Sequence, residues 1–197
     1  MEDVPCLQMS RYEQLCNIFV SHPFAENESL DLYHVYDNLS RTPLGRYGIE
    51  CDDPDRYLMA PWHVITPLKM RKHLDWGNRE PTQFISFYDN RDSAFKEARR
   101  RRAASLAAFG RRRQLGKQDR DPGTVSVAHV RLDKNSNVWV FSKEELMRMI
   151  PEYDIFQMAG KNEWFVWEYV PLEHVVGLWK YDRWGRLTFR AKTSQPL

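Results

Sequence analysis

The stretch Asn162-Glu163-Trp164-Phe165-Val166-Trp167-Glu168-Tyr169-Val170-Pro171 is the most informative segment of the chain. Residues 164–170 are rich in aromatic and β-branched side chains, so they predict a strand that ends at Pro171. Glu163 opens this strand beside bulky apolar neighbours. Such a carboxylate is either a partly desolvated catalytic group or a solvated edge residue, and the stretch alone leaves both interpretations open.

The length of 197 residues predicts a single domain, 1–197, large enough to bury a core without a disulfide or a metal ion. The three cysteines are odd in number and lack the spacing of a zinc site, which indicates reduced thiols in an intracellular, cytoplasmic protein. The N-terminus lacks the apolar run of a signal peptide, and no segment of the sequence is apolar enough to span a membrane. We therefore expect neither a metal nor a membrane as a partner.

The periodicity of the apolar residues predicts the strands and helices. Strands are expected at 31–37, 83–88, 124–132, 138–141, 163–170, 175–181 and 186–190, and helices at 68–76, 92–109 and 143–150, with a helical N-terminal extension over 1–30. Loops are expected at 38–62, 110–123 and 151–162, the second of them flexible and basic. Because the helices do not alternate one for one with the strands, the pattern predicts an α+β fold with mainly antiparallel strands.

Three polar residues lie on predicted strands between apolar neighbours. His34 is in the middle of the strand at 31–37, Ser86 is in the middle of the strand at 83–88, and Glu163 opens the strand at 163–170. Taken singly, a His or Ser in such a place is more often buried and hydrogen-bonded for structural reasons than functional. Their order and surroundings are therefore more informative than any one of them.

Three segments together resemble the ADP-ribosyltransferase superfamily, and within it the branch of cholera toxin and heat-labile enterotoxin. Leu32-Tyr33-His34-Val35 is similar to the family's first strand, and Phe84-Ile85-Ser86-Phe87-Tyr88 followed by Arg91-Asp92-Ser93-Ala94 is similar to its Ser-Thr-Ser strand and the next helix. Glu163 with Val170-Pro171 and Gly177 is similar to the strand of the catalytic glutamate. The resemblance implies split, mainly antiparallel sheets with flanking helices.

The resemblance also implies NAD as the cofactor and assigns roles to the three polar residues. Cleavage of the bond between nicotinamide and ribose passes through a transition state with oxocarbenium character, which a fixed carboxylate such as Glu163 would stabilise. Ser86 would hold Glu163 in place, and His34 would bind the adenosine ribose or lie near the phosphates. Tyr33 and Tyr88 would border the cofactor, with the Tyr88 ring available for stacking on nicotinamide.

The sequence departs from the family pattern in ways that bear on the acceptor. His34 replaces the arginine of the enterotoxin branch, and Phe87-Tyr88 replaces Thr-Ser. Lys161 stands two residues before the glutamate, where the arginine-modifying enzymes carry Glu or Gln. Because a cation does not orient an arginine, we expect a different acceptor, or hydrolysis of NAD by water.

A basic segment suggests a macromolecular partner. Residues 91–120 hold eleven Lys or Arg and three Asp or Glu, with Arg99, Arg100 and Arg101 in an unbroken run. Such a segment either contacts a polyanion or is a solvated helix face. The alternative function is thus an inactive module of this fold that binds nucleic acid or an acidic protein. Tyr153 and Phe156, in the expected loop 151–162, are further candidates for contact with an acceptor or partner.

Overall fold

The computed structural model describes residues 29–37, 40–52, 66–75, 80–114, 124–133, 136, 138–150, 153–182 and 184–191. The helical extension predicted over 1–30 lies outside these residues, apart from its last two. Within the described ranges, no helix is long and apolar enough to cross a membrane. The same ranges contain no group of three or more His, Cys, Asp or Glu side chains arranged to hold a metal ion.

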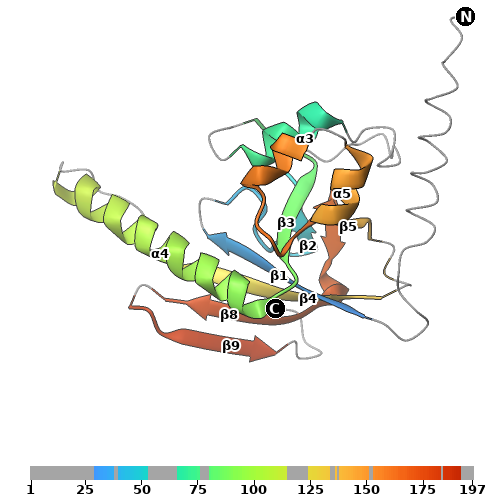
Figure 1. Ribbon diagram of the computed structural model, residues 1–197. Helices are drawn as coiled ribbons and strands as arrows, with labels where there is room; N and C mark the ends of the chain where they lie inside the picture. The colour runs from blue at the N-terminus through green and yellow to red at the C-terminus, as the bar shows by residue number, and fades with distance from the viewer. Residues whose placement is uncertain are drawn as a thin grey trace, which may run out of the picture.

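The fold is built on a seven-stranded antiparallel sheet with the strand order β5-β6-β3-β1-β4-β8-β9 (Figure 1). The strands are β1 (Leu30–Asp37), β3 (Phe84–Tyr88), β4 (Val125–Leu132), β5 (Val140–Ser142), β6 (Glu163–Trp167), β8 (Val175–Tyr181) and β9 (Leu187–Ala191). A second sheet pairs β2 (Gly48–Glu50) with β7 (Tyr169–Pro171). The predicted α+β class with mainly antiparallel strands is therefore confirmed.

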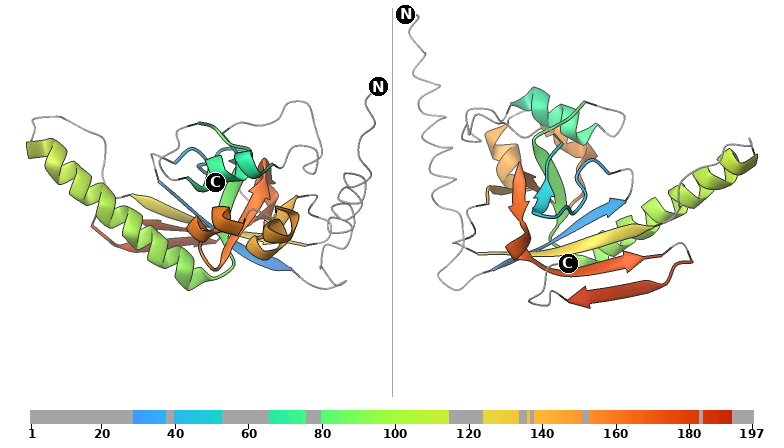
Figure 2. Two further views of the ribbon diagram at one scale, coloured as in Figure 1. Left: turned by 45° about the horizontal axis from the view of Figure 1, so that its top comes forward. Right: turned by 180° about the vertical axis from the view of Figure 1, so that it is seen from behind.

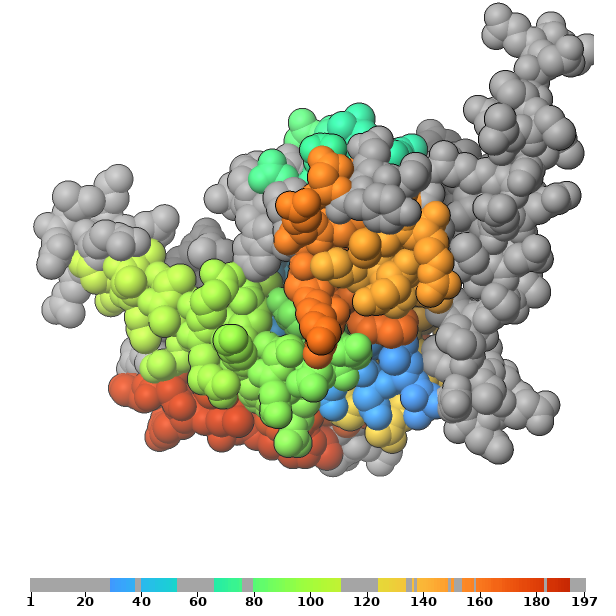
Figure 3. All heavy atoms as spheres, viewed as in Figure 1, coloured from blue at the N-terminus to red at the C-terminus, as the bar shows by residue number. Residues whose placement is uncertain are grey.

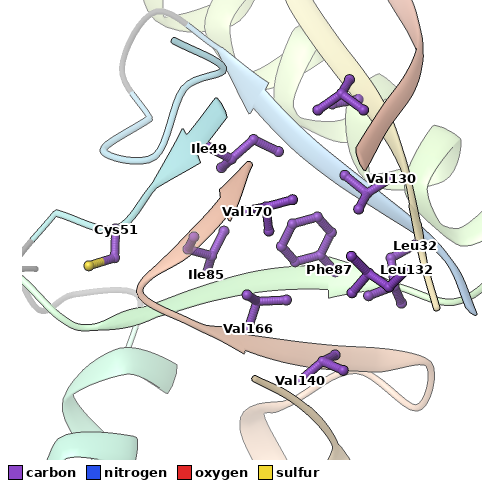
Figure 4. Close-up of a cluster of buried hydrophobic side chains, with 12 residues drawn as sticks. Leu32, Ile49, Cys51, Ile85, Phe87, Val130, Leu132, Val140, Val166 and Val170 are labelled. Carbon is purple, nitrogen blue, oxygen red and sulfur yellow. The ribbon is translucent and has the colours of Figure 1, made fainter. Parts of the chain in front are cut away.

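One face of the large sheet packs against the small β2–β7 sheet. Leu32 of β1 points to this side, where Ile49 and Val170 of the small sheet meet Ile85 and Phe87 of β3 (Figure 4). All five side chains are fully buried. The strand predicted at 31–37 is confirmed, and its even-numbered apolar residues join this core, as the alternation of side chains along a strand requires.

The opposite face of the large sheet is covered by α4 (Arg91–Gln114), from which Ala94 and Ala98 pack against Val35 and Val127. The second half of this helix extends beyond the edge of the sheet (Figure 2). The sequence predicted that the helix ends before Gly110, but it continues to Gln114, so the start of the expected loop 110–123 is helical. A β-carbon at Gly110 would meet nothing within 4 Å. Glycine in such an open position weakens a helix without ending it.

A third core lies under α3 (Pro67–Leu74), α5 (Lys143–Met149) and a 3₁₀ turn, η1 (Tyr153–Met158). Met70, Leu146 and Phe156 from these elements pack against Phe84 and Phe165 of the sheet. The helices predicted at 68–76 and 143–150 are confirmed, and each begins at a side-chain cap. The Thr66 hydroxyl accepts from the Lys69 N–H, and Ser142 and Glu145 form a complete capping box. The loop expected at 151–162 is wrong in part, because η1 occupies half of it.

The strand predicted over 163–170 is two strands, with a break at Glu168. This residue has a positive φ of 61°, which turns the chain from the large sheet into the small one. Its N–H donates to the Gln83 oxygen at 2.7 Å, and its oxygen accepts from the Cys51 N–H at 2.7 Å. Tertiary hydrogen bonds thus hold a conformation that local sequence disfavours. The expected loop 38–62 is also wrong at Gly48–Glu50, since this segment becomes β2 by pairing with β7.

The large sheet opens between β1 and β3. The eight residues of β1 pair with β4 from Leu30 to Asp37, whereas over their described lengths β1 and β3 pair only at Tyr33 and Tyr88. The sheet is therefore nearly divided into the halves β5-β6-β3 and β1-β4-β8-β9. Ser86, the central residue of the site described next, lies on β3 beside this opening.

Candidate functional site

Ser86 and Glu163 lie on the same face of the sheet. Phe84, Ser86 and Tyr88 alternate along β3, so that Phe84 enters the core under α3 and Tyr88 packs near α4. Tyr88 is paired with Glu163 of β6, and Ser86 is paired with Phe165. Glu163 is therefore the diagonal neighbour of Ser86 across the two strands, close enough for side chains to interact. Both residues lie at the seam between α4 and the layer of α3, α5 and η1.

The Glu163 side chain is buried, and its carboxylate accepts hydrogen bonds from the protein. The residue is 8% exposed, and its Oε2 accepts a hydrogen bond from the Gly160 N–H at 2.8 Å. Burial raises the pKa of the Glu163 carboxyl, while the hydrogen bonds from Gly160 and from the Ser86 hydroxyl oppose that rise. Lys143 lowers the same pKa and Glu97 raises it. The carboxylate is thus partly desolvated, which is one of the two interpretations that the sequence left open, and is not a solvated edge residue.

The Ser86 hydroxyl is held from the other side by His73 of α3. His73 Nε2 lies 2.9 Å from Ser86 Oγ, and His73 Nδ1 lies 2.8 Å from Thr82 Oγ1. Burial, together with the positive charge of Arg41, lowers the pKa of His73 to about 4, so the ring is neutral at pH 7. One tautomer satisfies every contact: Thr82 donates to Nδ1, Nε2–H donates to Ser86, and Ser86 donates toward Glu163. These side chains form a directed chain that ends on the carboxylate.

His73 was not among the residues predicted from the sequence. A usable signal was present, because Met70, His73 and Leu74 follow the i, i+3, i+4 spacing that places residues on one face of a helix. Met70 and Leu74 are buried in the core beneath α3. A histidine between them therefore points toward the sheet. The spacing could not predict which strand residue His73 would contact.

His34 bridges the opening in the sheet. The residue is 3% exposed, with Nδ1 2.8 Å from the backbone oxygen of Ser86 and Nε2 2.7 Å from the backbone oxygen of Thr42. Burial lowers its pKa to about 4, so the ring is neutral and donates a single N–H. Thr42 Oγ1, 3.3 Å from Nε2, is placed to donate to that nitrogen when Nδ1 carries the proton. Because both ring nitrogens face protein atoms, the predicted contact of His34 with a cofactor ribose does not fit this conformation.

The two tyrosines assigned to the cofactor lie in different surroundings. Tyr88 borders the site, since Glu163 is one of the charges that act on it, and burial raises the pKa of its hydroxyl. Its ring also lies close to Gly160, because a β-carbon at that glycine would be 3.9 Å from the ring. Tyr33 instead stacks on His129, with ring centroids 4.8 Å apart. Tyr33 is therefore part of an aromatic cluster of the sheet.

Comparison with known proteins identifies the family. The family described as "Domain of unknown function (DUF7587)" matches residues 31–183, a span that includes every residue of the site. The chain belongs to the DUF7587 family. No curated protein matches the sequence. Among solved structures, the chain named EcPltA is similar, with 16% sequence identity, a TM-score of 0.41, and coverage of 83% of this chain and 84% of that one. A likeness this distant fixes neither fold nor activity.

Two of the three arginines predicted to contact a partner, Arg100 and Arg101, form ion pairs within the protein. Arg100 and Arg101 both bind Glu97, with Nε–O distances of 2.7 and 2.8 Å. Arg101 also donates to the Val35 oxygen at 3.0 Å, which ties α4 to β1. Arg99 is exposed on α4. Two of the three arginines thus have a structural contact that the sequence did not predict.

Three further residues near η1 were predicted to contact an acceptor or partner, and the side chains of two of them, Lys161 and Phe156, are described by the structure. Lys161 is exposed, two residues before Glu163. Phe156 is 1% exposed and belongs to the core under α3, so the prediction that it contacts an acceptor or partner is wrong. The physical reason is that η1 folds back onto the sheet and buries its apolar side. The Tyr153 side chain lies outside the described part of the structure.

Proposed function

We propose that this protein is an enzyme of the ADP-ribosyltransferase type, which cleaves the nicotinamide–ribose bond of NAD with Glu163 as the catalytic carboxylate. One observation carries the proposal: Ser86 of β3 contacts Glu163 of β6 through its hydroxyl and His34 of β1 through its backbone oxygen, so that residues of three separate strands are linked. Ser86 is the centre of this arrangement. Its backbone oxygen accepts from His34, and its hydroxyl contacts both His73 and Glu163.

The chemistry requires a fixed negative charge. When the bond from ribose C1′ to the nicotinamide nitrogen breaks, its electron pair leaves with nicotinamide and positive charge develops on the ribose. A preorganised carboxylate in a poorly solvated site stabilises that charge more strongly than one in water. A nucleophile then bonds to C1′ and loses a proton. Glu163 would stabilise the charge, and the chain from Thr82 through His73 and Ser86 would keep the carboxylate in one orientation.

His34 has a supporting role in this proposal. Its two contacts hold Ser86 of β3 and Thr42 close to β1 where the strands have parted. It therefore fixes the backbone on which the Ser86 hydroxyl stands. This differs from the direct contact with NAD that the resemblance implied.

The acceptor is proposed to be water or a group other than arginine. Lys161 is exposed beside the strand of Glu163, and its charge would repel a guanidinium. Water as acceptor would make the protein an NAD glycohydrolase. A protein or nucleic acid acceptor is compatible with the same chemistry, and Arg99 and Lys161 would then lie on the surface that meets it.

The enclosure of Glu163 favours an alternative function. At 8% exposure, the carboxylate reaches a ribose only if neighbouring elements move. An inactive module of this fold, binding nucleic acid or an acidic protein through α4, would need no such movement. The two functions differ in one measurable property, which is release of nicotinamide.

The deciding experiment compares wild type with Glu163→Gln, which keeps the shape of the side chain and removes its charge. We expect nicotinamide release from NAD by wild type and a loss on the order of 100-fold or more in the variant. Glu173→Gln, at an exposed residue of η2 (Leu172–His174), is the matched control and should retain wild-type turnover. Melting temperatures with and without NAD report binding separately. No release of nicotinamide by wild type, with or without NAD binding, would support the inactive module, and equal turnover in Glu163→Gln would refute the assigned role.

A further inference from the structure

Lys143 is the first residue of α5, a position that the helix itself does not explain. The N-terminal end of a helix carries partial positive charge, which favours acidic residues and opposes a lysine. The next two positions, Glu144 and Glu145, follow this preference, and Glu145 completes the capping box with Ser142. Lys143 departs from it. The contacts of its side chain supply another reason for its presence.

The Lys143 side chain is bonded to the peptide group that also binds Glu163. Lys143 Nζ donates to the Ala159 oxygen at 2.9 Å. The Ala159 carbonyl and the Gly160 N–H belong to one peptide unit, and this N–H donates to Glu163 Oε2 at 2.8 Å. An ammonium bonded to the carbonyl polarises the peptide and makes its N–H a stronger donor. Lys143 therefore reaches the carboxylate through a single peptide group.

The segment between η1 and β6 lies next to α4 and α5, the two helices whose charged side chains act on Glu163. On the face shown in Figure 3, the segment around η1 lies between α4 and α5. α4 contributes Glu97, which raises the pKa of Glu163 and is itself bonded to Arg100 and Arg101. β3 contributes Tyr88, and Lys161 lies two residues before the carboxylate. Of these groups, Lys143 is the cation that lowers the pKa of Glu163.

We propose that Lys143 is a positioning residue for Glu163, which holds the Ala159–Gly160 peptide against the carboxylate and keeps that carboxylate negatively charged. This inference rests on the proposed function for its catalytic consequence, though not for its structural part. Lys143 touches neither substrate nor reacting atoms in this role. It acts on catalysis only through the orientation and charge of Glu163.

Three variants separate this role from a structural one. Lys143→Met removes the charge and the donor while keeping an unbranched chain, and Lys143→Arg keeps both. Lys180→Met, at an exposed residue of β8, is the control for loss of one positive charge elsewhere. The pKa of Glu163 is measured by NMR titration of carboxyl-labelled glutamate, with the signal assigned by its absence from Glu163→Gln. The activity readout is the dependence of kcat/KM for nicotinamide release on pH.

We expect the pKa of Glu163 to move upward in Lys143→Met and to stay at the wild-type value in Lys143→Arg and Lys180→Met. The acid limb of the kcat/KM profile, which reports the free enzyme, should move to higher pH by the same amount, because the ionised fraction of a carboxyl falls about tenfold for each pH unit below its pKa. An unchanged titration of Glu163 in Lys143→Met would overturn the inference. If that variant does not fold, Lys143→Gln takes its place with the same outcomes.

Failure of the inference and failure of the proposed function give different results. A wild-type protein that releases no nicotinamide would refute the proposed function, yet the titration would still decide whether Lys143 acts on Glu163. A wild-type protein that is active, with the same Glu163 pKa in all the lysine variants, would refute the role of Lys143 alone. If Lys143 only joins α5 to the segment after η1, its replacement would lower the melting temperature but leave the pKa of Glu163 unchanged.

Discussion

His34 Nδ1 lies 2.8 Å from the backbone oxygen of Ser86, at the place where β1 and β3 have ceased to pair. A side chain thus replaces the ladder of backbone hydrogen bonds that would otherwise join the two halves of the sheet. The histidine joins β1 to β3 across this opening. This contact holds the backbone of Ser86, the residue at the centre of the candidate site.

Loss of the His34 ring should destabilise the protein. In His34→Leu, the backbone oxygen of Ser86 loses its donor and the Thr42 hydroxyl loses its acceptor, and we expect the free energy of unfolding to fall by about 2 kcal/mol. His129→Leu is the control, because His129 of β4 forms a pair with the partly exposed Asp31 and should cost less than about 1 kcal/mol. Urea denaturation measures both. Equal losses in the two variants would contradict the bridging role.

The chain from His73 to Glu163 should behave as one unit in catalysis. His73→Phe keeps a ring among the aromatic neighbours Phe84 and Phe165 but removes both hydrogen bonds. We expect kcat for nicotinamide release to fall roughly ten- to hundredfold in His73→Phe and in Ser86→Ala, as is usual for residues that orient a reacting group. The double variant should be no slower than Ser86→Ala alone, since His73 acts through Ser86. Multiplicative losses would show that the two residues act independently.

The stability of the protein should decrease as the solution is acidified from neutrality. Burial lowers the pKa of both His34 and His73 from 6.5 to about 4. Between pH 6.5 and about 4 the unfolded chain binds more protons than the folded protein. The free energy of unfolding therefore falls by about 1.4 kcal/mol per pH unit for each of the two histidines as the pH is lowered through that window. Glu163 acts in the opposite direction, because the pKa of its carboxyl is raised. Urea denaturation at pH 7, 6 and 5 should show this loss, and His34→Leu should reduce its slope.

Two glycines should respond oppositely to the same substitution. Gly48 of β2 has a φ of 144°, and a β-carbon there would lie 2.0 Å from the Val170 oxygen. Gly48→Ala should therefore cost more than about 4 kcal/mol, or prevent folding, because backbone must move to relieve the clash. Gly110→Ala, in the open interior of α4, should stabilise the protein by about 0.5 to 1 kcal/mol. Thermal unfolding distinguishes the two, and a destabilised Gly110→Ala would show that the helix is not formed there.

The local elements could be predicted because their signals are contained in a few neighbouring residues. Alternation placed Leu32 and Val35 on opposite faces of β1, and the hydroxyls of Thr66 and Ser142 marked helix starts through hydrogen bonds to the next turn. Pro171 marked the end of an apolar stretch correctly. The break at Glu168 gave no such signal, because it is held by Gln83 and Cys51 from distant segments.

The sequence by itself determined the strands of the large sheet, the α+β class and the candidate residues Glu163, Ser86 and His34. Only the tertiary structure decided what these residues touch. It made His34 a bridge to a backbone oxygen, added His73 and Lys143 to the site, and buried Phe156 in the core. The physical reason is range: propensity and periodicity act between neighbours in the chain, whereas these contacts depend on how strands and helices far apart in sequence pack together.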